Sequence, residues 1–256
     1  MIKFKLFILS FLFISFSGFS QKKKYNKEEL RMLKEYYFNE GFNQPARKKV
    51  STLVMDDGTE RKGYVRSLRF NRGLVKTVVF KDSVTDKKEH VSVEDINEAL
   101  FYGGGFEKFL KIDDQISRLG TGKRNNMKKA TTADQIYFVK LPVSIRNKKD
   151  KESLLMQLLN PQFDDYISVY HDPRAAESGG FSVGGATFGG GIIKSYYVKK
   201  GDKIIWLPKK DLKKQYDWLF GDNEEFMKKY PLKSINWDWF SALVLEYTKM
   251  SLEQES

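Results

Sequence analysis

The sequence of 256 residues contains no cysteine and 2 histidines. Without cysteine the chain has no disulfide framework, no thiolate metal site, no cysteine nucleophile and no lipid-modified N-terminal cysteine. Because zinc and iron sites are built mainly from cysteine and histidine, the scarcity of both argues against a metal centre, and no motif indicates another cofactor. These absences favour binding over catalysis as the class of function.

Long hydrophobic runs are also lacking, except at the N-terminus. Lys3 and Lys5 precede an apolar stretch over residues 6–19, and two small residues, Gly18 and Ser20, are placed for cleavage after Ser20. This is the layout of a secretory signal peptide, and the run is shorter than the roughly 17–25 residues that a membrane span needs. We therefore expect export to the periplasm or the medium, with no transmembrane span in the mature chain.

Acidic residues are too few to balance the basic ones, so the formal net charge is +12. Residues 21–130 hold 25 basic and 16 acidic residues, whereas residues 131–256 hold 18 and 17. The positive charge is concentrated at residues 61–81, which contain seven basic residues and no acid, and again at residues 118–129. Such surfaces bind anionic polymers, or simply keep a protein soluble. The candidate ligand-binding residues are Arg66, Arg69, Arg118, Lys123 and Arg124.

Export argues against a nucleic-acid partner for these basic segments. Lipopolysaccharide phosphate or another anionic envelope polymer is the partner that their chemistry would fit, and another envelope protein is the alternative.

Hydrophobic periodicity predicts an α+β fold. An N-terminal helix is expected over residues 26–40, followed by an antiparallel β-meander that curls into a half-barrel. Mixed strands and C-terminal helices follow. The predicted helices of this part include a short one over residues 150–159, one that Asp222 caps, and a last one that begins at Ser234. The expected strands are residues 50–55, 62–70, 74–80, 91–94, 135–145, 166–170, 192–198 and 203–207.

The same patterns suggest a division of the chain into units. The predicted units are a signal peptide (1–20), an N-terminal tail and helix (21–48), a β-meander unit (49–117), a basic linker (118–134) and a mixed α/β unit ending in helices (135–256).

Residues 179–191 contain seven glycines in thirteen positions. Glycine lets backbone N–H groups approach an anion closely, so a phosphate or glycan cradle is one interpretation, and a flexible loop between strands is the other. The spacing matches neither the dinucleotide-binding nor the P-loop pattern. The candidate ligand-binding glycines are Gly184, Gly185, Gly189 and Gly190.

His171 and Asp172 stand side by side at the end of a predicted strand, before a proline. A hydrolase could use such a pair, but it would need further partners that the sequence does not reveal, and a strand-end turn explains the residues equally well. Trp239 falls outside the apolar stripe of the last predicted helix, and we therefore expect it to make an exposed contact, such as stacking on a sugar.

Several short motifs follow one another along the chain, namely an Asp-Gly turn after the first strand, later strands of the meander, a leucine-rich segment and a Tyr-Tyr-Val-Lys-Lys-Gly-Asp hairpin. They lie at residues 53–58, 63–65, 78–81, 91–96, 154–170, 196–202 and 207–247. In this order they resemble the motifs of a group of uncharacterised secreted proteins of Bacteroidota. This chain departs from the group at residues 160–163 and in its glycine-rich stretch. The group has no established activity, so the resemblance implies an envelope protein and assigns no site residue.

Together these observations predict an exported, non-catalytic envelope protein with a binding or structural role. The alternatives are a cell-surface or periplasmic hydrolase and a binder of anionic polymers or lipopolysaccharide.

Overall fold

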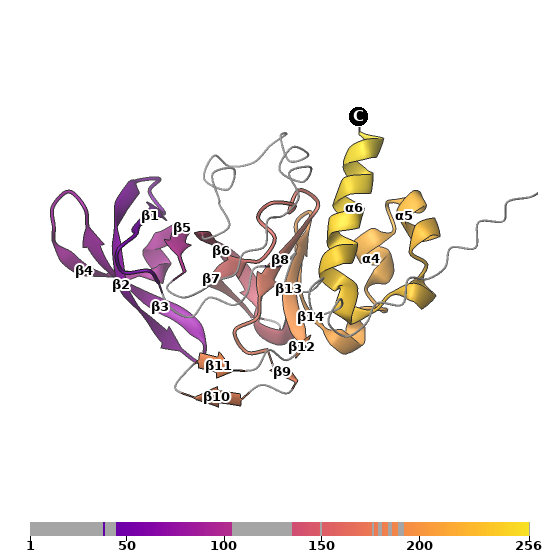
Figure 1. Cartoon of the computed structure of the whole chain (residues 1–256), viewed down its shortest axis with the longest axis horizontal. Helices are drawn as coiled ribbons and strands as arrows, with labels where there is room; N and C mark the ends of the chain where they lie inside the picture. The colour runs from indigo at the N-terminus through magenta and orange to yellow at the C-terminus, as the bar shows by residue number, and fades with distance from the viewer. Residues whose placement is uncertain are drawn as a thin grey trace, which may run out of the picture.

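The computed structural model describes residues 38, 45–103 and 135–255, apart from positions 149, 176, 179–180, 184–185 and 189–191. Its main element is one antiparallel sheet of ten strands, in the order β14-β13-β8-β7-β6-β5-β1-β2-β3-β4 (Figure 1). The strands of this sheet are β1 (Val50–Met55), β2 (Glu60–Asn71), β3 (Leu74–Asp82), β4 (Lys88–Ser92), β5 (Ile96–Tyr102), β6 (Gln135–Ser144), β7 (Lys151–Leu158), β8 (Ile167–His171), β13 (Ser195–Lys200) and β14 (Lys203–Pro208). Two short ribbons lie outside it, β9 (Glu177–Ser178) with β12 (Ile192–Ile193) and β10 (Phe181–Val183) with β11 (Ala186–Phe188).

The described helices are short, except the last one. They are α4 (Tyr216–Phe220), α5 (Glu224–Lys229) and α6 (Phe240–Gln254), and the single 3-10 turns are η1 (Val93–Asp95), η2 (Ile145–Asn147), η3 (Lys209–Asp211), η4 (Leu232–Ser234) and η5 (Trp237–Trp239). A large sheet with C-terminal helices confirms the α+β class. No helix in the described part of the chain has the length and apolarity that crossing a membrane would require. The predicted N-terminal helix lies outside the described residues, except for Phe38.

The predicted four-strand meander is present as β1 to β4. Its tight turns follow from local chemistry. The first turn contains Gly58 at φ +82°, and the Asp57 carboxylate accepts a hydrogen bond from the Thr59 N–H at 2.8 Å. The second turn has two residues, Arg72 and Gly73, both at positive φ, which is the backbone of the hairpin turns that match strand twist.

The meander curls back toward the middle of the sheet. β3 and η1 both contact β7. The β2–β3 turn reaches the segment after β8, where the Arg174 Nε donates to the Arg72 carbonyl at 3.4 Å. A hydrophobic cluster fills the inside of this curl, and it draws residues such as Val65, Phe80 and Phe138 from strands far apart in the sequence.

Residues 150–159 do not form the expected helix, because the segment is β7. Leu155 packs into the cluster inside the curl, whereas Leu154 and Met156 pack into a second cluster on the opposite face. A strand buried on both faces has a continuous apolar run, which hydrophobic periodicity alone cannot distinguish from a short buried helix.

The C-terminal helices cover one face of β8, β13 and β14 (Figure 1). The apolar stripe of the last helix lies as predicted, with Phe240, Leu243 and Tyr247 buried. Two boundaries differ from the expectation. Asn223 caps α5 in place of Asp222, since its side chain accepts from the Phe226 N–H at 2.9 Å. The last helix begins at Phe240 and not at Ser234, because two single turns precede it.

The two predicted β-containing units share this one sheet. β5 from the first pairs directly with β6 from the second, with Tyr102 opposite Gln135. Strands from both predicted units therefore belong to the same sheet.

Candidate functional site

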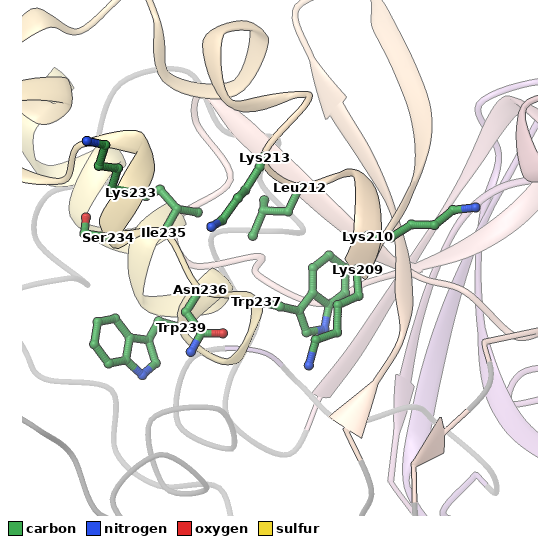
Figure 2. A pocket seen from close by; sticks show the side chains of 10 residues that line it. All are labelled: Lys209, Lys210, Leu212, Lys213, Lys233, Ser234, Ile235, Asn236, Trp237 and Trp239. Atoms are coloured by element: carbon green, nitrogen blue, oxygen red, sulfur yellow. The ribbon is translucent and has the colours of Figure 1, made fainter.

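A groove of about 480 Å³ lies beside the end of the sheet, where the chain leaves β14 and enters the helices (Figure 2). One wall comes from η3 and the residues that follow it, and the other comes from η4, η5 and the two residues between them. The lining residues are Lys209, Lys210, Leu212, Lys213, Lys233, Ser234, Ile235, Asn236, Trp237 and Trp239.

The first wall is set by Leu212. This side chain is buried in the core beneath α6, so its neighbours in the sequence are turned outward and Lys209, Lys210 and Lys213 are exposed. The Lys209 N–H donates to the Lys194 carbonyl at 2.8 Å, which fixes the start of η3 against the residue that precedes β13. In Figure 2, Lys213 extends toward the opposite wall and Lys210 extends away from it.

The second wall is held by turns and by an indole. The Ser234 N–H and hydroxyl both donate to the Pro231 carbonyl, at 2.7 and 2.8 Å. The Trp237 Nε1 donates to the Ile193 carbonyl at 2.6 Å, and its ring stacks on Phe240 with centroids 5.6 Å apart. Ile235 is also buried, so this wall is anchored in the core beneath α6.

The electrostatics of the groove are one-sided. Four lysines line it, and none of its lining residues is acidic. Lys209 lies 3.6 Å from the Asp238 carboxylate. Within the described part of the chain, no carboxylate lies within 4 Å of the ammonium groups of Lys210, Lys213 or Lys233. A concave site with uncompensated positive charge attracts anions.

Trp239 is the one predicted site residue that lies in this groove. It is half-buried and packs against the core beneath α6, and it also lines the groove. The side chain that was expected to be exposed is therefore half-buried, at a concave part of the surface. Figure 2 shows its indole close to Asn236, on the same wall.

The predicted arginine sites lie elsewhere. Arg66 and Arg69 belong to β2, at the other end of the sheet from η3. The Arg66 guanidinium lies over the Tyr64 ring at 5.6 Å and donates to the Arg47 carbonyl at 3.4 Å. The remaining candidates lie outside the described residues, namely Arg118, Lys123, Arg124, Gly184, Gly185, Gly189 and Gly190.

The His171–Asp172 pair lies within reach of a serine, but its hydrogen bonds are not those of a hydrolase. Asp172 is 2% exposed and accepts from the Ser195 hydroxyl at 2.7 Å and from the Trp206 indole at 2.8 Å. In a catalytic triad, histidine stands between the serine and the carboxylate. Here the serine donates directly to Asp172, while the buried His171 Nδ1 has no hydrogen-bond partner in the described part of the chain.

The environment of His171 also disfavours the charged imidazolium. Burial lowers the pKa of His171, and the Asp172 charge opposes this only in part. The arrangement supports Asp172 as a structural acceptor that ties β8, β13 and β14 together.

A second polar cluster joins the sheet to the helices. The Lys200 ammonium donates to Asp222 at 2.6 Å, to the Leu219 carbonyl at 2.7 Å and to the Tyr247 hydroxyl at 2.9 Å. Burial raises the pKa of Tyr247, as does its hydrogen bond to Asp222. All three protons of the ammonium are engaged, so this cluster fastens α4 and α6 to β13.

Sequence reasoning missed the four lysines of the groove. A local signal was present for three of them, since Lys209, Lys210 and Lys213 fall within five residues. The near-zero net charge of this half of the chain masked it.

No metal-binding group of three or more histidine, aspartate or glutamate side chains occurs among the described residues. In comparisons with known proteins, no family model, curated protein or solved structure matches this chain.

Proposed function

We propose that this protein is an exported, non-catalytic binding protein that holds an anionic ligand in the groove between η3 and η5. The observation that carries this proposal is a concave site lined by four lysines and no acid. Its size falls in the range of roughly 300–1,000 Å³ that is usual for ligand sites. The N-terminal signal-peptide pattern and the resemblance to envelope proteins support export and an anionic envelope component as the source of the ligand.

The groove can hold its shape without a ligand. Leu212, Ile235 and Trp237 anchor both walls in the core, so the lysines are mounted on fixed backbone. A preformed site loses little conformational entropy on binding. The lysine side chains themselves are exposed, and each ion pair that they form with a ligand therefore contributes modestly, at about 0.2–1 kcal/mol.

The test compares two double variants of equal charge. Lys213→Ala with Lys233→Ala removes one cation from each wall, while Lys87→Ala with Lys88→Ala removes two exposed lysines near β4 as the matched control. The mature chain is titrated with heparin as a generic polyanion at 0.15 M salt. Because two ion pairs are removed, we expect the groove variant to bind about tenfold more weakly and the control to change by less than about twofold.

An equal loss of affinity in both variants would show that bulk charge is responsible, and it would overturn the proposal. Raising the salt should weaken binding by the wild type more steeply than binding by the groove variant, because screening acts on the ion pairs that the variant lacks.

A further inference from the structure

We propose that the free edge of β4 binds an extended acidic segment of a partner protein, which joins the sheet as an additional antiparallel strand. β4 is the last strand of the sheet and lies at the opposite end from β14 and the groove (Figure 1). This surface is therefore separate from the groove and does not depend on the function proposed for it.

β4 is an edge strand with unpaired backbone groups. It pairs with β3 on one side, and no described strand lies on its other side. The Asp82 N–H donates to the Lys87 carbonyl at 3.0 Å, which sets the alternation of hydrogen bonds along the ladder. Because antiparallel pairs alternate between hydrogen-bonded and non-hydrogen-bonded positions, the N–H and C=O groups of Lys88 and His90 point away from β3. These groups can receive a further strand.

The other edge of the sheet is blocked by a side chain. The Asn147 amide donates to the Trp206 carbonyl at 2.8 Å and accepts from the Trp206 N–H, also at 2.8 Å. It makes the two hydrogen bonds that a strand next to β14 would make. In the described part of the chain, no side chain bonds the outward backbone groups of β4 in this way. The sheet therefore has one blocked edge and one open edge, and extended peptides add to open edges.

The side chains beside the open edge favour an acidic occupant. Lys88 and His90 are exposed, and among the described residues Lys88 has no carboxylate within 4 Å. The acid of β4, Glu89, is already paired with Arg61. On the same face as Lys88, two strands further in, lies the exposed Arg69, which also has no ion-pair partner in the described part of the chain. A strand with carboxylates on that face can pair with these cations, and a basic strand is repelled by them.

A second copy of this chain fits the edge less well. Pairing of β4 with another β4, centred on His90, would bring two histidines face to face and add a second unpaired lysine to a surface that already carries one. Lysine on an edge strand is a common device against such self-pairing. It does not oppose an acidic strand, so Lys88 disfavours a copy of this chain and favours the proposed partner.

The probe is the peptide Thr-Glu-Thr-Glu-Thr-Glu-Thr with blocked ends, because alternation places all its carboxylates on one face of a strand. Calorimetry measures its binding to the mature chain at 0.15 M salt. The same peptide with glutamine in place of glutamate should bind about tenfold more weakly. The order Glu-Glu-Glu-Thr-Thr-Thr-Thr keeps the charge but not the alternation, and it should lose a similar factor.

Methylation of backbone nitrogens tests the hydrogen bonds without changing the charge. In an antiparallel ladder, the residue opposite His90 lies on the same face and directs its N–H toward β4. The glutamates of the bound peptide are therefore the residues whose N–H groups face the edge. N-methylation of the glutamates should weaken binding about tenfold more than N-methylation of the inner threonines. Equal affinities of the two methylated peptides would show that charge attraction alone is responsible, and they would overturn the proposal.

Variants of β4 make the same comparison on the protein. His90→Pro removes an N–H that points away from β3, so the ladder with β3 keeps its hydrogen bonds. His90→Ala removes the imidazole and keeps the N–H. The proline variant should therefore bind the peptide about tenfold more weakly than the alanine variant. Equal binding by the two would contradict strand addition.

Charge reversal covers the case in which the proline variant folds poorly. Lys88→Glu leaves every backbone group in place and should weaken binding of the peptide about tenfold. Lys148→Glu reverses an exposed lysine beside the blocked edge and is the matched control, with an expected change of less than about twofold. Equal losses in the two variants would show an effect of net charge and would overturn the proposal.

Two other occupied sites give different results. If Lys213→Ala with Lys233→Ala abolished binding of the peptide, the peptide would lie in the groove and the proposal for β4 would fail. Sedimentation that shows a dimer of the wild type, which His90→Pro dissociates, would identify a second copy as the occupant and would also overturn the proposal. Heparin has no peptide backbone to add to the sheet. The Lys87→Ala with Lys88→Ala variant should therefore weaken binding of the peptide while it serves as the control for heparin in the groove.

Discussion

Replacing Asp172 by alanine tests whether this carboxylate is structural. Three donors converge on it, namely the Ser195 hydroxyl at 2.7 Å, the Trp206 indole at 2.8 Å and the Arg174 backbone N–H at 2.9 Å. In the alanine variant all three lose their acceptor in a place that solvent hardly reaches, since Asp172 is 2% exposed.

The expected magnitude follows from these partners. A buried donor left without an acceptor costs about 1–3 kcal/mol. The serine hydroxyl can rotate and the Arg174 N–H is only partly buried, so both should lie at the low end of that range, while the fixed indole should lie in the middle. Asp172→Ala should therefore lower the free energy of unfolding by about 4 kcal/mol. Asp172→Asn keeps one acceptor oxygen and should cost about half as much.

Urea unfolding followed by far-ultraviolet circular dichroism measures these differences, provided that the m-value is the same for each variant. Asp202→Ala, in the exposed turn between β13 and β14, is the control and should change stability by less than about 0.5 kcal/mol. A loss below about 1 kcal/mol for Asp172→Ala would refute the structural role assigned to this carboxylate.

Two further predictions concern a turn and a titratable group. Gly73→Ala should destabilise the protein more than Gly58→Ala, although both glycines have φ +82°. A Cβ added at Gly73 would lie 2.6 Å from the Pro173 carbonyl oxygen, whereas a Cβ added at Gly58 would meet open space. Equal shifts of the urea midpoint in the two variants would contradict the contact between the β2–β3 turn and the segment after β8. The pKa of His171 in the folded protein lies below its unfolded value of about 6.5, so the unfolded chain binds more protons. The free energy of unfolding should therefore fall as the pH drops from about 7.5 to about 5.5. His171→Gln should reduce this pH dependence, and an unchanged slope would argue against burial of His171 as its cause.

The strands of the meander could be predicted from the sequence because their turns are set locally. Asp57 and Gly58 form the turn between β1 and β2, and Gly73 completes the turn between β2 and β3. Short-range chemistry therefore sets where these three strands meet. β7 could not be predicted in the same way. Its leucines satisfy both a helical and a two-sided strand pattern, and the choice depends on β6 and β8, which lie on either side of it.

Pro142 lies where β6 has a neighbouring strand on one side only, as the missing N–H of proline requires. Proline within a strand is usually confined to the edge of a sheet, yet β6, which contains Pro142, lies in the interior. β5, however, pairs with β6 only as far as Val139, so Pro142 has a ladder partner on one side alone, Ser153 of β7. Pro142 is therefore locally at an edge, although β6 as a whole is an interior strand.

The candidate site was predictable only in part. Trp239 could be singled out because it departs from the helical stripe. The lysines could not be assembled into a site, since Lys213 and Lys233 are separated by 20 positions and by two helices. The net charge of each half of the sequence predicted the basic surface within residues 21–130. In residues 131–256 the acidic residues nearly cancel the lysines in the net charge, although none of these acids lines the groove.

The pairing of β5 with β6 has a consequence for how this protein can change over evolutionary time. Tyr102 and Gln135 already face each other across the ladder, although residues 103–134 stand between them in the sequence. A turn of a few residues could make the same connection, and the entropy of closing a loop grows only slowly with its length. The length of this connection is therefore a weak constraint on the register of the ladder, which the facing residues of β5 and β6 set.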